Sequence, residues 1–368
     1  MRINSLRLAA AAGALLWGAS VAAQGTIIVP DATDRTTRVG TRGANFLEIG
    51  VGARSQGLGA AAASMTDGPE AMFWNPAGIV TRTDFAAFVS YMQLYGNSGI
   101  TNTAAALTVP VGQGTFGFAF TQFGSGSIDR TTEVAPDGND PAFPGQFQYT
   151  GTSFAVQYAR NITDRLSASG GVRFVQEGID FAQTSFFGID LATRFRTGLY
   201  GLSVAAAVTN IGPANRWTGS GVERRISAPR ENGFSTGASI PVQYNTRKVQ
   251  LPTGFRVGLQ SSLLGDAEAL FGTSKTHTLV GEVDFFDAID TDIQPSLGFE
   301  YGYKSNYFLR AGKRFFNEQH APWKVADGLS FGGGVKIPVL GRKLTLDYAY
   351  TTMGELQHNQ VLSFEIGH

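Results

Sequence analysis

The sequence predicts an all-β protein, a transmembrane antiparallel β-barrel of about 14 strands with an N-terminal Gly/Ala-rich plug (hatch) that contains a short helix. Three observations predict this fold. Long segments alternate apolar and polar residues with the period of a strand, their connections alternate between short and long, and a compact Gly/Ala-rich segment precedes them. Composition agrees, because charged residues make up only 16% of the chain, against about 25% in soluble domains.

The first 45 residues predict an exported chain with an extended lead-in. Arg2 and Arg7 begin an apolar run that ends in a small-residue cleavage site, so residues 1–23 are expected to be a cleaved signal peptide. Residues 24–45 are polar and predict a periplasmic lead-in. No later apolar stretch reaches the roughly 20 residues that a membrane-spanning helix needs. We therefore expect an outer-membrane location without a helical anchor.

Residues 46–82 predict the plug, because closely spaced glycines allow backbone bends and contacts that side chains would prevent. A short helix is expected to begin at Asp67 and to end before Pro76, since a residue before proline is pushed out of the α region. The segment is expected either to wedge itself into the barrel wall or to gate a lateral opening, and both alternatives stay open. The plug and gate candidates are Gly57, Gly59, Asp67, Trp74, Asn75 and Pro76.

Residues 83–368 predict the barrel. Each alternating segment is near the roughly 9–11 residues that cross a bilayer at a tilt. An exceptional long connection at 263–275 interrupts the pattern of short turns, and the connection after Asn210 is expected to contain a hairpin around 234–242. The predicted strands are 85–94, 100–109, 115–123, 149–160, 166–176, 185–196, 199–208, 252–261, 276–286, 293–303, 307–316, 329–337, 344–350 and 361–367.

Each predicted strand has an apolar face and a charged or Gly-rich face, as where Leu297, Phe299 and Tyr301 alternate with Gly298 and Glu300. We expect the apolar face to meet lipid and the charged face to line the lumen. Because the lumen charges nearly balance, they favour a salt-bridge network that holds wall and plug over a charge-selective pore. The network candidates are Arg173, Asp190, Arg194, Arg196, Arg256, Glu282, Asp284, Glu300, Arg310, Lys336 and Asp347. Three inward residues are candidates for lining a hydrophobic ligand: Phe186, Phe286 and Phe308.

Composition and motifs argue against several classes of function. The chain has no cysteine and a formal net charge of +0, which excludes disulfides and thiolate chemistry and argues against a nucleic-acid partner. The four histidines are far apart, so no metal site or other cofactor is expected. A G-x-S-x-G match at 233–237 keeps an enzyme as a minor alternative, but it lies in a Pro-flanked loop and not in a strand-to-helix turn. We expect no enzyme and no catalytic residue.

Motifs in the plug and in the middle of the barrel carry a resemblance to a known family. They are Phe46-Leu47, 49–54, Gly57-Leu58-Gly59, Asp67, Ala71, Trp74-Asn75-Pro76-Ala77-Gly78, 210–213 and 251–258. With these motifs, most of the mature chain resembles the PorV/PorQ family, a branch of the FadL-like outer-membrane barrels.

The resemblance implies a non-enzymatic role in protein export or surface delivery of the type IX secretion kind. Secretion-machinery subunits or secreted cargo would then bind through the outer loops, and outer-membrane lipid would surround the barrel. The alternative is FadL-like passive transport of hydrophobic small molecules, long-chain fatty acids or hydrocarbons, which would bind in the lumen. A filled barrel that acts only as a scaffold is a third possibility, and the sequence leaves all three open.

Overall fold

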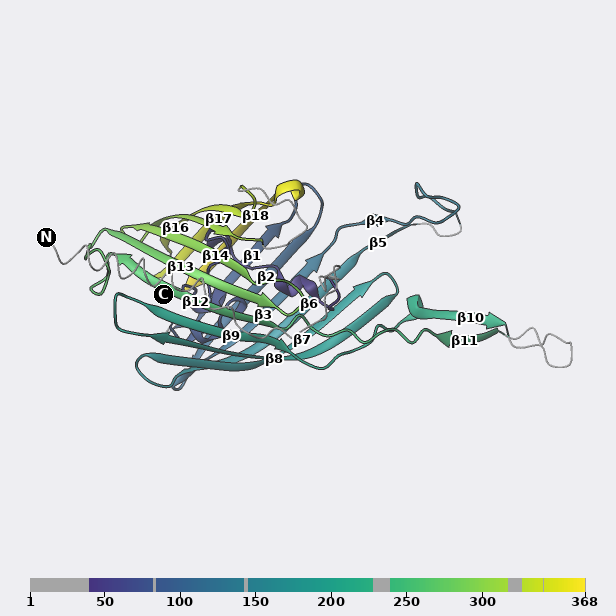
Figure 1. Cartoon of the computed structure of the whole chain (residues 1–368), viewed down its shortest axis with the longest axis horizontal. Helices are drawn as coiled ribbons and strands as arrows, with labels where there is room; N and C mark the ends of the chain where they lie inside the picture. The colour runs from purple at the N-terminus through teal and green to yellow at the C-terminus, as the bar shows by residue number, and fades with distance from the viewer. Residues whose placement is uncertain are drawn as a thin grey trace, which may run out of the picture. The chain divides into compact units, whose positions relative to one another are not determined.

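A computed structural model of the chain describes residues 40–81, 84–141, 145–227, 239–316, 326–339 and 341–367. Within these residues the chain forms one closed antiparallel barrel (Figure 1), in the order β1-β18-β17-β16-β15-β14-β13-β12-β9-β8-β7-β6-β3-β2. The predicted 14-stranded barrel is thereby confirmed. The predicted signal peptide and residues 24–39 of the predicted lead-in lie outside the described residues, as does the G-x-S-x-G serine.

Most barrel strands begin and end within about three residues of the predicted segments, because the two-residue period marks strand ends where it stops. The bounds are β1 Ala86–Gln93, β2 Thr101–Val111, β3 Gly114–Gly124, β6 Tyr149–Asn161, β7 Leu166–Ile179, β8 Ala182–Arg196, β9 Ser203–Ile211, β12 Gly254–Leu264, β13 His277–Ala288, β14 Gln294–Tyr303, β15 Tyr307–Arg314, β16 Leu329–Val339, β17 Arg342–Thr352 and β18 His358–Gly367.

The connections divide the barrel into two ends. One end carries short turns at 112–113, 162–165 and 304–306, with 265–276 as the exception that the sequence also shows. The other end carries the long connections 125–148 and 212–253. In bacterial outer-membrane barrels short turns are periplasmic and long loops are extracellular. We therefore call the long-connection end the outer end.

Two small hairpins project beyond the strands at the outer end (Figure 1). One pairs β4 Ile128–Asp129 with β5 Gln146–Phe147, and the other pairs β10 Glu223–Ser227 with β11 Ser239–Gln243. The second hairpin lies in the connection after Asn210, as expected, but its first strand comes before the predicted bounds of 234–242. The residues between β10 and β11, 228–238, lie outside the described part of the chain.

The barrel strands present one apolar and one polar face, as the alternation predicts. On β8, Phe187, Ile189 and Leu191 are 49%, 44% and 52% exposed, whereas Asp190 between them is fully buried. Large apolar residues recur on the outward face of the other strands, with Phe120, Phe299 and similar side chains exposed. A continuous exposed apolar surface of this kind suits contact with lipid and not with water.

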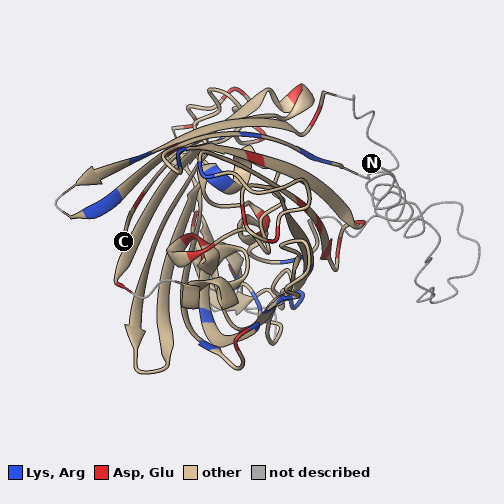
Figure 2. Ribbon diagram, turned by 90° about the vertical axis from the view of Figure 1, so that its left-hand side faces the viewer, with Lys and Arg blue, Asp and Glu red and all other residues tan. Residues whose placement is uncertain are grey.

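The plug lies inside the ring of strands (Figure 2). It comprises η2 Asn45–Glu48, α2 Ala53–Gly57, η3 Gly68–Phe73 and η4 Pro76–Thr81. The expected helix after Asp67 is the 3₁₀ helix η3, and Pro76 starts the next one instead of only ending the first, since proline is well accommodated at a first helical position. None of the described helices is long and apolar enough to cross a membrane.

Candidate functional site

Glycines on both partners let the plug approach the wall closely. A Cβ on Gly57 would lie 3.1 Å from the Cα of Gly332 on β16, and one on Gly59 would collide with the backbone of β15. Between them, the backbone of Leu58 occupies the place that a side chain at Gly312 would need. Helix α2 and the residues after it therefore pack directly on the Gly-rich lumen face of the wall. Larger side chains on either surface would prevent this short distance between the two backbones.

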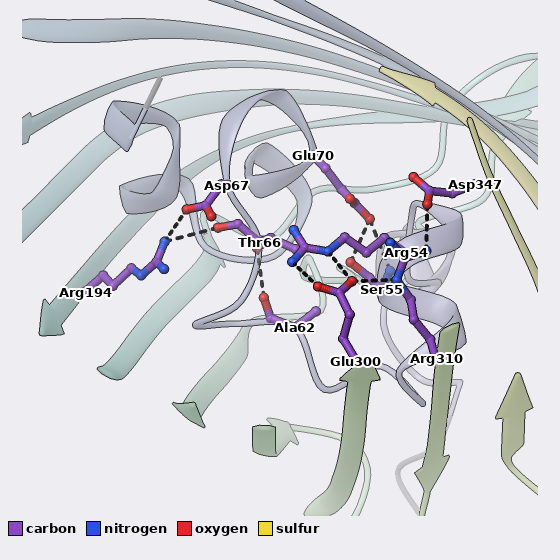
Figure 3. Close-up of polar contacts among 10 residues, drawn as sticks. All are labelled: Arg54, Ser55, Ala62, Thr66, Asp67, Glu70, Arg194, Glu300, Arg310 and Asp347. Atoms are coloured by element: carbon purple, nitrogen blue, oxygen red, sulfur yellow. Dashed lines mark hydrogen bonds and ion pairs between the residues drawn. The ribbon is translucent and has the colours of Figure 1, made fainter. Parts of the chain in front are cut away.

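A buried ion-pair cluster joins this helix to the wall (Figure 3). Arg54 of α2 donates two hydrogen bonds of 2.9 Å to the carboxylate of Glu300 on β14. Arg310 on β15 lies 2.6 Å from Glu300 and 2.6 Å from Asp347 on β17, and its side chain is only 2% exposed. Pairing of this kind is what makes charges tolerable in a water-poor interior.

A second ion pair holds the start of η3. Asp67 lies 2.6 Å from Arg194 on β8, and the same guanidinium donates to the carbonyl of Thr66 at 3.3 Å (Figure 3). The hydroxyl of Thr66 in turn donates to the carbonyl of Ala62 at 2.8 Å. Arg194 thus attaches the turn before η3 to the wall, and the hydrogen bond between Thr66 and Ala62 stabilises the turn within the plug.

The Ala run of the plug binds two carboxylates of β13. The backbone amides of Ala62 and Ala63 donate to Asp284 Oδ2 at 2.9 and 3.0 Å, and the amide of Ser64 donates to Glu282. Arg256 on β12 lies 3.6 Å from Asp284. Successive backbone amides form a concave site for anions, so this short run binds the wall without any charged side chain of its own.

Trp74 and Asn75 have different partners. The indole Nε1 of Trp74 donates to the carbonyl of Val51 at 2.7 Å, and the guanidinium of Arg256 lies 4.7 Å from the ring centre. The amide of Asn75 donates to the carbonyl of Thr193 on β8 at 3.0 Å. Trp74 therefore braces the plug internally, and Asn75 attaches it to the wall.

Four predicted network members have other surroundings. Arg173 pairs with Asp190 at 2.7 Å between β7 and β8, and Lys336 lies 4.8 Å from the ring centre of Phe308. The expectation that Arg196 faces the lumen network is wrong, because it is the last residue of β8, is exposed, and donates to the carbonyl of Asp164 in the adjacent turn.

The three phenylalanines predicted to line a ligand do not lie together. Phe186 packs with Phe46 of the plug, Phe286 lies 4.4 Å from the guanidinium of Arg256, and Phe308 lies beside Arg310 and Lys336 in a small charged cavity of about 40 Å³. None of them lines a second cavity, which lies at the outer ends of the strands.

That cavity, about 660 Å³, lies between the plug and the outer strand ends. We call it the outer cavity. Aromatic rings pack along one wall: Phe46 and Phe123 are stacked with their centres 6.2 Å apart, and Phe123 meets Tyr149 edge-on at 5.7 Å. Its other apolar contributors include Ile49, Met92, Leu94, Trp217 and Phe316, and its charged ones are Arg42, Glu48, Glu177 and Arg314.

Burial also marks a carboxyl group of the plug. Glu70 is 4% exposed and accepts a 2.7 Å hydrogen bond from the hydroxyl of Ser55. Burial raises its pKa to about 7, although Arg54 and Ser55 act in the opposite direction. Its carboxyl group occupies the space of a side chain at Gly52, which explains the glycine there.

Replacing Glu70 by glutamine is expected to stabilise the protein at pH 8 and not at pH 4. Between its usual pKa of 4.5 and about 7, the folded protein holds a proton that the unfolded chain has released. The free energy of unfolding therefore falls as pH rises through that window, by up to about 3 kcal/mol. Urea unfolding of both proteins at the two pH values measures the difference, and an equal effect at both would contradict the assignment.

No protein-family model and no curated protein sequence matches the chain. Several solved structures do match it. The Ralstonia pickettii toluene transporter TbuX matches with a TM-score of 0.57 at 14% identity, over 86% of this chain and 98% of that one. The Pseudomonas putida toluene transporter TodX matches at 0.53 and 11%, over 86% and 96%, and a Pseudomonas aeruginosa FadL homologue at 0.50 and 12%, over 86% and 98%. At such identities the likeness shows the fold alone, which is that of FadL-like barrels.

Proposed function

We propose that the protein carries hydrophobic small molecules passively across the outer membrane. The observation that carries this proposal is the outer cavity, which has a volume of about 660 Å³ and an aromatic wall. Ligand sites are typically concave, largely apolar and provided with a few placed polar groups. The shared fold with two toluene transporters supports the same function class.

Because the plug occupies the lumen, the protein does not form a simple water-filled pore. It is bound to the wall through Glu300, Arg194 and Asp284, and the lumen beside it carries buried charges. A molecule in the outer cavity therefore meets a filled lumen, and passage requires a rearrangement of plug or wall. The wedge that Asn75 forms with β8 is the contact that we expect such a rearrangement to break.

Uptake of radiolabelled toluene by cells that carry the protein in their outer membrane tests the proposal. We expect Phe123→Ala to slow uptake about tenfold, because the lost ring removes an aromatic contact worth about 1 kcal/mol or more to the ligand. Phe120→Ala is the matched control, since Phe120 lies on the same strand and is 42% exposed on the outward face. Equal rates for both variants and the unaltered protein would contradict the proposal.

Protein export of the PorV/PorQ kind is the second candidate. The projecting hairpins favour it, because Ile226 and Ile240 are each 43% exposed and Tyr244 is 57% exposed at the outer end. Exposed apolar groups of this kind often mark contacts with another protein. An affinity pull-down from detergent-solubilised outer membrane, with mass spectrometry of bound proteins and lipids, tests it. Stable protein partners without a hydrophobic ligand would favour export, and a stoichiometric hydrophobe alone would exclude it.

A further inference from the structure

The outer cavity contains carboxyl oxygens that lack hydrogen-bond donors. Glu48 Oε1 and Glu177 Oε1 belong to residues that line the cavity, and Asp290 lies next to Glu48 in the connection between β13 and β14. Glu48 Oε1 and Glu177 Oε1 are buried and accept no hydrogen bond from a donor group of the described residues. Glu48 forms a hydrogen bond with Asp290 when a proton lies between the two carboxyl groups. A buried acceptor without a donor costs free energy, so a ligand that supplies a donor here gains the difference.

Three donors beside these carboxyl groups, the amide of Ala44, the hydroxyl of Tyr149 and Nε of Arg314, already have acceptors. The second oxygen of Glu177 accepts from the amide of Ala44 at 2.8 Å and from the hydroxyl of Tyr149 at 2.7 Å. Arg314 donates from Nε to Gln294 at 2.8 Å, and its guanidinium lies 5.4 Å from the ring centre of Phe316. The guanidinium therefore lowers the electrostatic cost of the carboxyl groups without filling their free oxygens.

The pKa of Glu48 agrees with a carboxyl group that lacks a donor. Burial and, after it, the neighbouring charge of Asp290 raise its pKa to about 7, although Arg314 acts in the opposite direction. Close carboxyl groups do not both ionise easily. Glu48 is therefore partly protonated near neutral pH, in a place where a ligand could provide the proton instead.

We propose that the outer cavity selects hydrophobic molecules that carry a hydrogen-bond donor, a hydroxyl or a protonated amine, over carboxylates of the same chain length. This inference rests on the proposed function and names its substrate class. The aromatic wall at Phe46 and Phe123 takes the hydrocarbon, and the free oxygens of Glu48 and Glu177 accept from the head group. A carboxylate head would instead meet like charges and would have to compete for Arg314.

Binding of four matched probes to the full chain in nanodiscs tests the inference. The probes are decane, decanol, decylamine and decanoate, measured by equilibrium dialysis against empty nanodiscs at pH 7.5. We expect decanol or decylamine to bind at least about tenfold more tightly than decanoate, as charge-assisted hydrogen bonds allow. Glu48→Gln should reduce this ratio severalfold, and Glu133→Gln, an exposed change on the outer connection 125–148, should leave it unchanged.

The outcomes separate the two proposals. If none of the four probes binds to folded protein, the proposed function fails. If decane binds and neither donor-bearing probe exceeds decanoate, or Glu48→Gln leaves the ratio unchanged, only the selectivity is overturned. A heat-modifiable shift on gel electrophoresis confirms that each variant is folded.

A second measurement distinguishes the amine from the hydroxyl. Raising the pH from 6 to 8.5 ionises Glu48, which should tighten binding of decylamine and leave that of decanol unchanged or weaker. Both results support a donor-selective cavity, whereas tighter binding of decanoate at pH 8.5 contradicts it. The titratable and charged groups around Glu48 are Asp290, Arg314, Glu177, Arg42, Tyr95 and Tyr149.

Discussion

Replacing Arg310 by methionine is expected to lower the free energy of unfolding by about 3 kcal/mol. The guanidinium lies 2.6 Å from both Glu300 and Asp347, and the side chain of Arg310 is 2% exposed. Water therefore does not take over the hydrogen bonds that the guanidinium donates. Glu300 keeps its bonds to Arg54, but Asp347 loses this ion pair inside the barrel. The cost therefore comes mainly from one buried and uncompensated carboxylate, at the lower end of the usual range for a broken buried pair.

Urea unfolding in detergent micelles, followed by the heat-modifiable gel shift, measures this loss. Arg342→Met is the matched control, because Arg342 is exposed and a surface ion contact contributes about 0–1 kcal/mol. Adding Asp347→Asn to Arg310→Met should recover much of the stability, since the unpaired charge is then gone. A loss for Arg310→Met no larger than that of the control would show that the cluster does not stabilise the barrel.

Replacing Gly312 by valine is expected to displace the plug from the barrel wall, so that ions can pass through the barrel. The new side chain would overlap the backbone of Leu58, which sits directly against β15. Overpacking of a tight contact costs about 1–3 kcal/mol. If the barrel strands absorb none of that cost, the population with a displaced plug rises roughly 5- to 150-fold.

Single-channel recording in planar bilayers measures the effect. Gly333→Val is the control, because Gly333 lies on the neighbouring strand β16 and its nearest neighbour in that direction, the carbonyl of Phe308, is 3.8 Å away. We expect frequent openings for Gly312→Val and rare ones for the control and the unaltered protein. Silent Gly312→Val channels with a native gel shift would mean that the plug tolerates the substitution.

The sequence predicts the barrel well because a strand repeats every two residues and each strand has one lipid face. On β8 the alternation of Ile189, Asp190 and Leu191 is sufficient to assign inside and outside. The same pattern gives no position along the barrel axis. That is why Phe186, Phe286 and Phe308 all face inward and yet lie apart, and why Arg196 falls at the rim instead of in the network.

The outer cavity is not visible in the sequence for a related reason. Its walls combine Phe46 and Glu48 of the plug with Met92, Glu177 and Thr351 from the outer ends of distant strands. Only closure of the barrel brings these residues together, and no local period marks them. The glycines of the plug indicate a close contact with the wall. The glycines of the wall that they meet, on β14 to β16, are identified only by the register of those strands.

Photolabelling with a small aryl-diazirine hydrocarbon tests the central claim, that hydrophobic molecules enter the barrel at its outer end, most directly. The protein in nanodiscs is irradiated with the probe, digested and mapped by mass spectrometry. We expect label on Phe46, Phe123 or Tyr149, and its loss when excess toluene competes. Label confined to outward residues such as Phe120 and Leu191, unaffected by toluene, would show contact with lipid-dissolved probe only and would rule out entry at the outer end.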